Sequence, residues 1–322
     1  MTVSSGRLLA ELVAPSLGAS IEGADARPTL VRGITHDSRL VAPGDLFCCI
    51  RGARADGHDH AAAAVAAGAV ALVVERDLPG IGVPRIVVDD ARVAMARLAC
   101  AFWGEPSQRL TVVGITGTNG KTTTAHLLGS IMRASGMPTE IIGTLSGAHT
   151  TPESTVLQPM LAHFAETGGR AVAMEVSSHA LALHRVDGMR FSAAVFTNLG
   201  RDHLDFHGDM ESYGAAKARL FTPEFCEVAV INVDDSFGAG LAAKSKVSVV
   251  PFARSDAAGL EITPTSHSYE WNGRRILVNL GGSINVMNSL AAASTARAIG
   301  IGLDAIVHGL GSAPAVPDRK ST

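Results

Sequence analysis

A short apolar segment, a glycine-rich turn and the sequence Gly-Lys-Thr-Thr follow one another between residues 111 and 123. Residues 111–116 predict a buried strand, and the residues from Lys121 to about Ala134 predict a helix. A glycine-rich turn in this position lets backbone N–H groups converge on an anion, and the N-terminus of the helix adds partial positive charge. The segment therefore predicts a phosphate-binding loop at the edge of an α/β sheet.

The expected nucleotide-binding residues are those of this loop and of the first helical turn: Gly117, Thr118, Asn119, Gly120, Lys121, Thr122 and Thr123. Lys121 is expected to reach the outer phosphates of ATP, and the Thr122 hydroxyl to bind Mg²⁺. The strict pattern G-x-x-x-x-G-K-[ST] is not met, because Ile115 stands where its first glycine would be. A glycine-rich turn that binds no ligand is the alternative interpretation.

The length of 322 residues favours two domains. We place the first at residues 1–108 and the second at 109–316, with a short tail at 317–322, and we expect Gly104-Glu105-Pro106-Ser107 to interrupt any helix between them. Strands and helices alternate, which predicts a mostly parallel sheet with helices on both faces. We expect strands at residues 33–38, 44–50, 70–74, 85–88, 111–116, 171–176, 193–198 and 228–232. We expect one helix that starts at His58 and further helices at residues 91–102, 121–134, 210–221 and 286–299. Asn272-Gly273 predicts the turn of a hairpin at residues 268–278.

Charge and hydrophobicity exclude several classes of protein. With 27 Lys and Arg against 30 Asp and Glu, the chain has no basic excess with which to coat nucleic acid. The longest apolar stretch, residues 61–74, is too short to span a membrane, and the N-terminus does not have the pattern of a signal peptide. The four cysteines have neither disulfide-framework nor zinc-ligand spacing. We therefore expect a cytoplasmic protein that neither binds nucleic acid nor inserts into a membrane.

Polar segments follow three of the expected strands, at residues 175–181, 197–205 and 232–235. Side chains at the carboxyl ends of parallel strands point into the ligand crevice of such a sheet. Glu175 offers the oxygen ligands that Mg²⁺ prefers. A single histidine is more often structural, but the clustering of histidines after successive strands favours a functional role. Lys217, taken alone, is typical of a solvated lysine on a helix.

Six groups of residues share a pattern with one known family. They are Asp37-Ser38-Arg39 with residues 43–47, Asp56-Gly57-His58, the phosphate loop, Thr150-Thr151-Pro152-Glu153, residues 175–181 and residues 197–208. In these groups the chain resembles the Mur ligases of bacterial peptidoglycan synthesis and, within them, the UDP-N-acetylmuramoyl-L-alanyl-D-glutamate ligases. The resemblance extends from about residue 30 to residue 316.

The resemblance implies an N-terminal Rossmann-like nucleotide-sugar domain and a central P-loop-type ATPase domain with a mostly parallel sheet. It also implies a reaction in which a carboxylate of a UDP-N-acetylmuramoyl dipeptide attacks the γ-phosphate of ATP and gives an acyl phosphate. The amine of a diamino acid, meso-diaminopimelate or lysine, then forms an amide and releases phosphate. Positioning and charge neutralisation would account for most of the phosphoryl step.

The resemblance assigns catalytic roles to Lys121, Glu175, His203 and Lys217. It implies that Thr122 and Glu175 hold one Mg²⁺ and that His203 helps to hold a second. Lys217 matches a lysine that reacts with CO₂, which replaces an ammonium by a carbamate anion able to face Mg²⁺. That reaction needs a neutral amine, which burial favours.

Further residues are implied to bind ligands. Asn285 and Asn288 match positions near the nucleotide. The positions that match contacts with the UDP-linked dipeptide are His36, Ser38, Ala53, Arg54, Ala55, His149, Thr150, Thr151, Ser177, Leu183 and Arg185. Arg185 suits a carboxylate because its guanidinium can donate to two oxygens.

The chain departs from the family in a few places. His149 stands where many relatives have Asn, Leu183 where many have Gln, and Gly200 where Ser is frequent, while Asp318 replaces the Gly before Arg319. The family's third domain, which binds the incoming amino acid, is expected to be absent, so which amino acid is added stays open. Two alternatives to a ligase therefore stay open. One is a module that binds ATP and the UDP-muramoyl peptide without turnover, and the other is an ATPase with a different acceptor.

Overall fold

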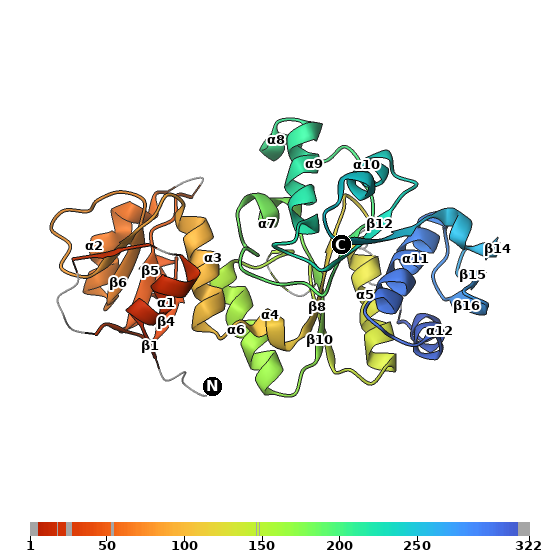
Figure 1. Cartoon of the computed structure of the whole chain (residues 1–322), viewed down its shortest axis with the longest axis horizontal. Helices are drawn as coiled ribbons and strands as arrows, with labels where there is room; N and C mark the ends of the chain where they lie inside the picture. The colour runs from red at the N-terminus through yellow and green to blue at the C-terminus, as the bar shows by residue number, and fades with distance from the viewer. Residues whose placement is uncertain are drawn as a thin grey trace. The chain divides into compact units, whose positions relative to one another are not determined.

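The computed structural model describes residues 6–17, 19–23, 28–52, 55–145, 147 and 149–314 (Figure 1). The chain divides into two compact units. The first contains Met1–Pro106, Glu153–His163 and Leu183–Met189, and the second contains Ser107–Pro152, Phe164–Ala182 and Arg190–Thr322. The domain boundaries expected at residues 108 and 316 stay a prediction, and the tail at 317–322 lies outside the described residues.

The first unit is built on an α/β sheet. Its elements are β1 (Arg7–Leu8), α1 (Leu9–Ser16), β2 (Ile21–Glu22), β3 (Leu30–Val31), β4 (Gly33–Thr35), η1 (Ser38–Leu40), β5 (Asp45–Cys48), η2 (Gly57–His60), α2 (Ala61–Ala66), β6 (Ala71–Val74), β7 (Arg85–Val87) and α3 (Ala91–Phe102). The sheet has five strands in the order β2-β7-β6-β5-β4, of which only β2 is antiparallel to its neighbour. Residues of β5 alternate between two cores: Leu46 and Cys48 pack with α1 and α3, and Phe47 packs with α2.

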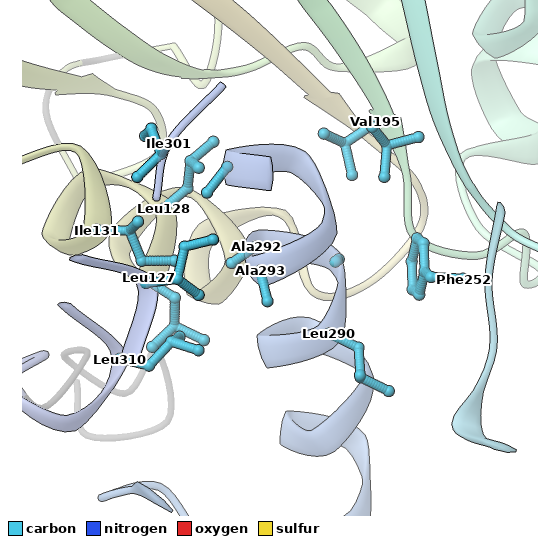
Figure 2. Packing of buried hydrophobic residues seen from close by; sticks show 14 of the residues in the cluster. Leu127, Leu128, Ile131, Val195, Phe252, Leu290, Ala292, Ala293, Ile301 and Leu310 are labelled. Carbon is cyan, nitrogen blue, oxygen red and sulfur yellow. The ribbon is translucent and has the colours of Figure 1, made fainter. Parts of the chain in front are cut away.

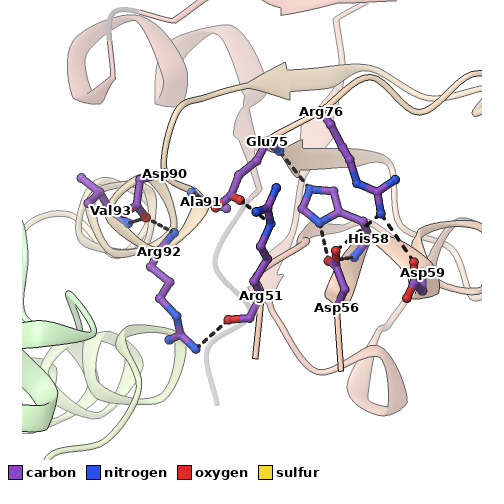
Figure 3. Close-up of polar contacts among 10 residues, drawn as sticks. All are labelled: Arg51, Asp56, His58, Asp59, Glu75, Arg76, Asp90, Ala91, Arg92 and Val93. Carbon is purple, nitrogen blue, oxygen red and sulfur yellow. Dashed lines mark hydrogen bonds and ion pairs between the residues drawn. The ribbon is translucent and has the colours of Figure 1, made fainter. Parts of the chain in front are cut away.

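A buried histidine ties together the loops at the carboxyl ends of β5 and β6 (Figure 3). The Glu75 backbone N–H donates to His58 Nε2 at 2.9 Å, so the ring proton lies on Nδ1, which donates to Asp56 at 2.5 Å. Glu75 Oε1 in turn accepts the Ala91 N–H at the start of α3, and Glu75 Oε2 pairs with Arg51. These contacts fix the polar edge of the first sheet.

The second unit contains the larger sheet. The remaining elements of the chain are α4 (Pro106–Arg109), β8 (Thr111–Thr116), α5 (Lys121–Ala134), β9 (Thr139–Ile142), α6 (Ser154–Glu166), β10 (Ala171–Glu175), α7 (Ser178–Ala182), β11 (Ala193–Phe196), α8 (Leu204–His207), α9 (Met210–Ala218), η3 (Arg219–Phe221), β12 (Val228–Asn232), α10 (Ser236–Lys244), β13 (Ser248–Phe252), η4 (Arg254–Asp256), β14 (Ala258–Ile262), β15 (His267–Trp271), β16 (Arg274–Val278), α11 (Ser283–Ala298) and α12 (Leu303–Gly311). α4 and α6 have residues in both units. Six strands form the sheet in the order β13-β12-β11-β8-β10-β9, and every neighbouring pair is parallel.

Aliphatic side chains hold the helices on one face of this sheet (Figure 2). Leu128 and Ile131 of α5, Leu290 of α11 and Leu310 of α12 belong to one fully buried cluster with Val195 of β11. Aromatic rings lie on the opposite face, where Phe196 contacts Phe221 and Phe237. Burial of both faces explains why these strands are continuously apolar.

A small antiparallel sheet, β14-β15-β16, packs beside α11. Its second hairpin turns at Asn272 and Gly273, with φ of 48° and 73°, the left-handed conformation that an Asn-Gly turn adopts most readily. His267 and Tyr269 both reach Ser289 of α11, at 2.8 and 3.0 Å. The hairpin is thereby fastened to the long helix.

The predicted mixed α/β fold with a mostly parallel sheet is confirmed. The interruption expected at 104–107 is confirmed, because α3 ends at Phe102 and a separate helix, α4, begins at Pro106. It is shorter than expected, since proline suits the first position of a helix, where its missing N–H has no partner to lose. α11 begins at Ser283, three residues before the expected start. In the described part of the chain, no helix has the length and apolar character needed to cross a membrane.

Candidate functional site

Three neighbouring strands of the second unit deliver the predicted polar segments to the same edge. β8 pairs with β10 on one side and with β11 on the other, all in parallel. The phosphate loop follows β8, Glu175 is the last residue of β10, and the segment containing His203 follows β11. Their common edge is the carboxyl end of the sheet, where ligands bind in folds of this class.

The phosphate loop needs its glycines for two reasons. Gly117 and Gly120 have φ of 148° and 87°, values that other residues rarely adopt. A Cβ atom at Gly117 would lie 1.9 Å from Thr197 Oγ1, and one at Gly120 would lie 2.3 Å from Asn288 Oδ1. Thr122 and Thr123 occupy the first turn of α5. The fold thus brings Asn288 of α11 to the loop, and Asn288 Nδ2 donates to Asn285 at 3.0 Å.

Asn198 and Thr197, to which the sequence assigned no individual role, stabilise the conformation of the phosphate loop through hydrogen bonds. Asn198 forms a pair of hydrogen bonds with the backbone of Asn119, one to its N–H and one to its carbonyl, each at 3.0 Å. Thr197 Oγ1 donates to the same carbonyl at 2.6 Å. Their sequence signal was their position at the end of a predicted strand. The structure assigns them to the support of the loop.

Two lysines converge on one backbone oxygen. Lys121 Nζ donates to the carbonyls of Gly117 and Thr118, each at 2.9 Å, and Lys217 Nζ donates to the Gly117 carbonyl at 3.0 Å. Lys217 is only 1% exposed, so the expectation of a solvated lysine is wrong. Burial, and then the charge of Lys121, lower the pKa of Lys217 to about 7.

Tyr213 fastens α9 to the loop one helical turn before Lys217. Its hydroxyl lies 3.2 Å from Thr118 Oγ1, and its ring centroid lies 4.4 Å from Lys217 Nζ. A cation over an aromatic face is attracted by the ring. α9 therefore contacts the phosphate loop through both residues, 213 and 217.

The Glu175 carboxylate is buried, with 1% of the residue exposed. Thr144, which follows β9, donates to it twice: from N–H to Oε1 at 3.0 Å and from Oγ1 to Oε2 at 3.2 Å. Thr151 Oγ1 donates to the Glu175 carbonyl at 2.9 Å and accepts the Ser177 N–H at 3.1 Å. Thr150, Thr151 and Ser177 of the predicted substrate set therefore lie close to Glu175, while His149 is exposed.

His203 lies in a group of aromatic rings with His179, His207 and Tyr213. It adopts φ of 51° at the start of α8, and its side chain is half exposed. Burial, and then the charge of Lys217, lower the pKa of His207, whose Nε2 lies 3.0 Å from Ser178 Oγ.

Carboxylate and hydroxyl oxygens are suitable ligands for Mg²⁺, so Glu175 and Thr122 fit that ion by chemistry. An ammonium group on Lys217 does not fit, whereas a carbamate would. Within residues 6–314, as far as they are described, no group of three or more His, Cys, Asp or Glu side chains is arranged to hold a metal. Of the predicted metal ligands, only Glu175 and His203 are residues of these four types. The metal-binding roles therefore stay predictions.

The other predicted substrate residues belong to the first unit. His36 Nδ1 lies 3.0 Å from Thr155 Oγ1, and burial lowers the pKa of its imidazole. Arg185 Nε donates to Glu153 at 2.9 Å, and Arg92 lies 3.7 Å from the other oxygen of that carboxylate. Two guanidinium groups therefore face one carboxylate, that of Glu153.

Five predicted substrate residues remain. Ser38 begins η1, Ala55 is exposed and Leu183 is half-buried. Ala53 and Arg54 lie outside the described residues.

Comparisons with known proteins agree with this architecture. Residues 115–296 match the Mur ligase middle domain, and residues 30–103 match a second description, Mur ligase family, catalytic domain. A UDP-N-acetylmuramoyl-L-alanyl-D-glutamate–2,6-diaminopimelate ligase of Geobacter metallireducens is 43% identical over 90% of this chain, and one of Streptomyces coelicolor is 41% identical over 97%. The chain spans 62% and 65% of the length of these two relatives.

Solved structures give the same picture. The structure of a UDP-N-acetylmuramoyl-L-alanyl-D-glutamate–2,6-diaminopimelate ligase matches with a TM-score of 0.82 at 27% sequence identity. The match covers 98% of this chain and 68% of the chain of that ligase. A structure of MurF from Acinetobacter baumannii has a TM-score of 0.72 at 26% identity, covering 98% of this chain and 70% of its own.

Proposed function

The chain belongs to the Mur ligase family, and from this premise we propose that it carries the ATP-binding and UDP-muramoyl-dipeptide-binding part of a UDP-N-acetylmuramoyl-L-alanyl-D-glutamate–2,6-diaminopimelate ligase. The observation that carries the proposal is the glycine loop after β8, which has Lys121 at its end and Asn288 against Gly120. A loop of this shape at a helix N-terminus suits the phosphates of a nucleotide.

In this proposal the substrate carboxylate attacks the γ-phosphorus of ATP, the bond to the β,γ-bridging oxygen breaks, and ADP leaves. The amine of diaminopimelate then attacks the acyl phosphate. Loss of a proton and of phosphate gives the amide. Lys121 binds the outer phosphates, while Asn285 and Asn288 lie beside the nucleotide. Two Mg²⁺ ions, one held by Thr122 and Glu175 and a second held in part by His203, would neutralise charge on the reacting groups.

The charges around Gly117 support a carbamate on Lys217. Two ammonium groups that donate to one carbonyl repel each other, and a pKa of about 7 leaves much of Lys217 neutral near that pH. The neutral amine adds to CO₂ and loses a proton, which gives a carbamate anion. The negative charge of the carbamate would attract both a bound cation and the ammonium group of Lys121.

Residues of each unit are assigned to the substrate in this proposal. Thr150, Thr151 and Ser177 of the second unit lie around Glu175 and would bind the dipeptide, together with His149. Arg185 and Leu183 of the first unit would also contact the dipeptide. His36, Ser38 and the segment Ala53–Ala55 would contact the nucleotide-sugar.

The test is incubation of the chain with ATP, Mg²⁺, UDP-N-acetylmuramoyl-L-alanyl-D-glutamate and diaminopimelate. Formation of the UDP-linked tripeptide with release of phosphate supports a ligase. Binding of both ligands without product supports a binding module that needs the remainder of the longer relatives. ATP hydrolysis at a rate unaffected by the muramoyl compound would overturn the proposal.

A further inference from the structure

Thr144 holds both oxygens of the Glu175 carboxylate. Its N–H donates to Oε1 at 3.0 Å, and its hydroxyl donates to Oε2 at 3.2 Å. The preceding residue is Gly143, where a Cβ atom would lie 2.2 Å from Oε1. The backbone after β9 therefore approaches the carboxylate as closely as only glycine permits, and Thr144 determines how the carboxylate is oriented.

The same hydroxyl touches a residue of the predicted substrate site. Thr144 Oγ1 lies 2.9 Å from Thr150 Oγ1. A hydroxyl has one proton, and a carboxylate that binds a cation can only accept hydrogen bonds. Since Thr144 donates its proton to Glu175, the proton between the two threonines must come from Thr150. The direction of the hydroxyl chain (Thr150 to Thr144 to Glu175) is thereby fixed.

This direction determines what Thr150 can offer to a ligand. Its only proton points toward Thr144, so its oxygen presents lone pairs outward and acts as an acceptor. A substrate N–H or O–H matches it, whereas a substrate carboxylate does not. The backbone beside Thr150 is also anchored to the same strand end, because Thr151 Oγ1 donates to the Glu175 carbonyl at 2.9 Å.

We propose that Thr144 is a positioning residue that couples a cation on Glu175 to recognition of a substrate N–H or O–H by Thr150. The inference rests on the proposed function, which assigns the cation to Glu175 and the UDP-linked dipeptide to Thr150. Thr144 restrains the carboxylate through two hydrogen bonds, and a cation on Glu175 would add a further restraint. The Thr144 and Thr150 hydroxyls then keep the orientation in which Thr150 accepts, and the second ligand finds the site already ordered.

The experiment is calorimetric titration of the chain with UDP-N-acetylmuramoyl-L-alanyl-D-glutamate, with and without saturating Mg²⁺ and the non-hydrolysable nucleotide AMP-PNP. The ratio of the two dissociation constants is the coupling factor. We expect about fivefold or more for the natural chain, the lower end of common allosteric couplings. Thr144→Val, which keeps the N–H bond to Glu175, should reduce the factor to about one, and Thr144→Ser should restore it.

Thr139→Val is the matched control, since it makes the same chemical change at the start of β9, where the hydroxyl donates to the Met137 carbonyl. This variant should keep the natural factor. If Thr144→Val does not fold, Thr150→Val breaks the chain at its other end and should also lose the coupling. A natural factor in either valine variant, or no coupling in the natural chain although both ligands bind, would overturn the inference. Failure of the natural chain to bind either ligand would instead refute the proposed function.

Discussion

Lys121 and Lys217 donate to the same acceptor, the carbonyl oxygen of Gly117, at 2.9 and 3.0 Å. One lysine comes from the first turn of α5 and the other from the last turn of α9. The pair keeps two cationic groups at one point of the phosphate loop, and the pKa of Lys217 is lowered to about 7 as a result of burial and of the charge of Lys121.

The first prediction concerns the modification of Lys217. The chain incubated with ¹³C-bicarbonate at pH 8 should give a carbamate carbon resonance in its NMR spectrum, because the amine is mostly neutral above a pKa of about 7. The resonance should be missing in Lys217→Met and present in Lys244→Met, which alters an exposed lysine at the end of α10. A resonance that persists in Lys217→Met would assign the carbamate elsewhere.

The second prediction concerns His267, which is buried between the Leu280 carbonyl and Ser289. Burial lowers its pKa in the folded protein, so the unfolded chain takes up the proton first as the pH falls below about 6.5. The free energy of unfolding should therefore decrease with falling pH in this range. His267→Gln should show a smaller decrease than the natural chain, measured by urea unfolding at pH 7.5, 6.5 and 5.5.

Its control is His308→Gln, which alters an exposed histidine on α12 and should keep the natural pH dependence. Parallel curves for the natural chain and His267→Gln would contradict the assignment.

The third prediction tests the polar edge of the first unit. His58→Ala leaves the Glu75 N–H without its partner, removes one of two hydrogen bonds to Asp56 Oδ1 and removes a buried ring. An unsatisfied buried polar group costs about 1–3 kcal/mol, so the free energy of unfolding should fall by about 2 kcal/mol or more. His60→Ala, in the same η2 turn but exposed, should change it by less than about 0.5 kcal/mol. Equal effects of the two variants would show that the His58 contacts contribute no stability.

Apolar periodicity and turn residues predict those strands and helices whose ends are set by neighbouring residues in the sequence. The strand at 111–116 and the helices at 91–102 and from Lys121 were predicted with their observed starts, because apolar periodicity and turn residues determine them. The helix at Ser154–Glu166 was not predicted, since Pro159 lies within it and proline usually ends a helix. The edge strands β9 and β13 were also missed, since β9 begins with two polar residues and β13 contains Pro251 and is only partly buried.

The site was predictable to the extent that its residues follow strands. Glu175 and the glycine loop were found in this way, whereas the burial of Lys217 depends on how α9 packs on the loop, and no local pattern contains that information. The same holds for Thr144 and for the contacts of Asn198, whose position after a predicted strand was its sequence signal. Each is an ordinary polar residue whose partner, Glu175 or Asn119, is distant in the sequence.

Nucleotide binding by the glycine loop is tested most directly by calorimetric titration of the chain with Mg²⁺ and AMP-PNP, in the natural form and as Lys121→Ala. Lys121 is expected to bind the outer phosphates, and a hydrogen bond to a charged group contributes about 1.5–3 kcal/mol. The variant should therefore bind the nucleotide at least about tenfold more weakly. Equal affinity of the two proteins, or no binding by the natural chain, would contradict the assignment of the glycine loop to a nucleotide.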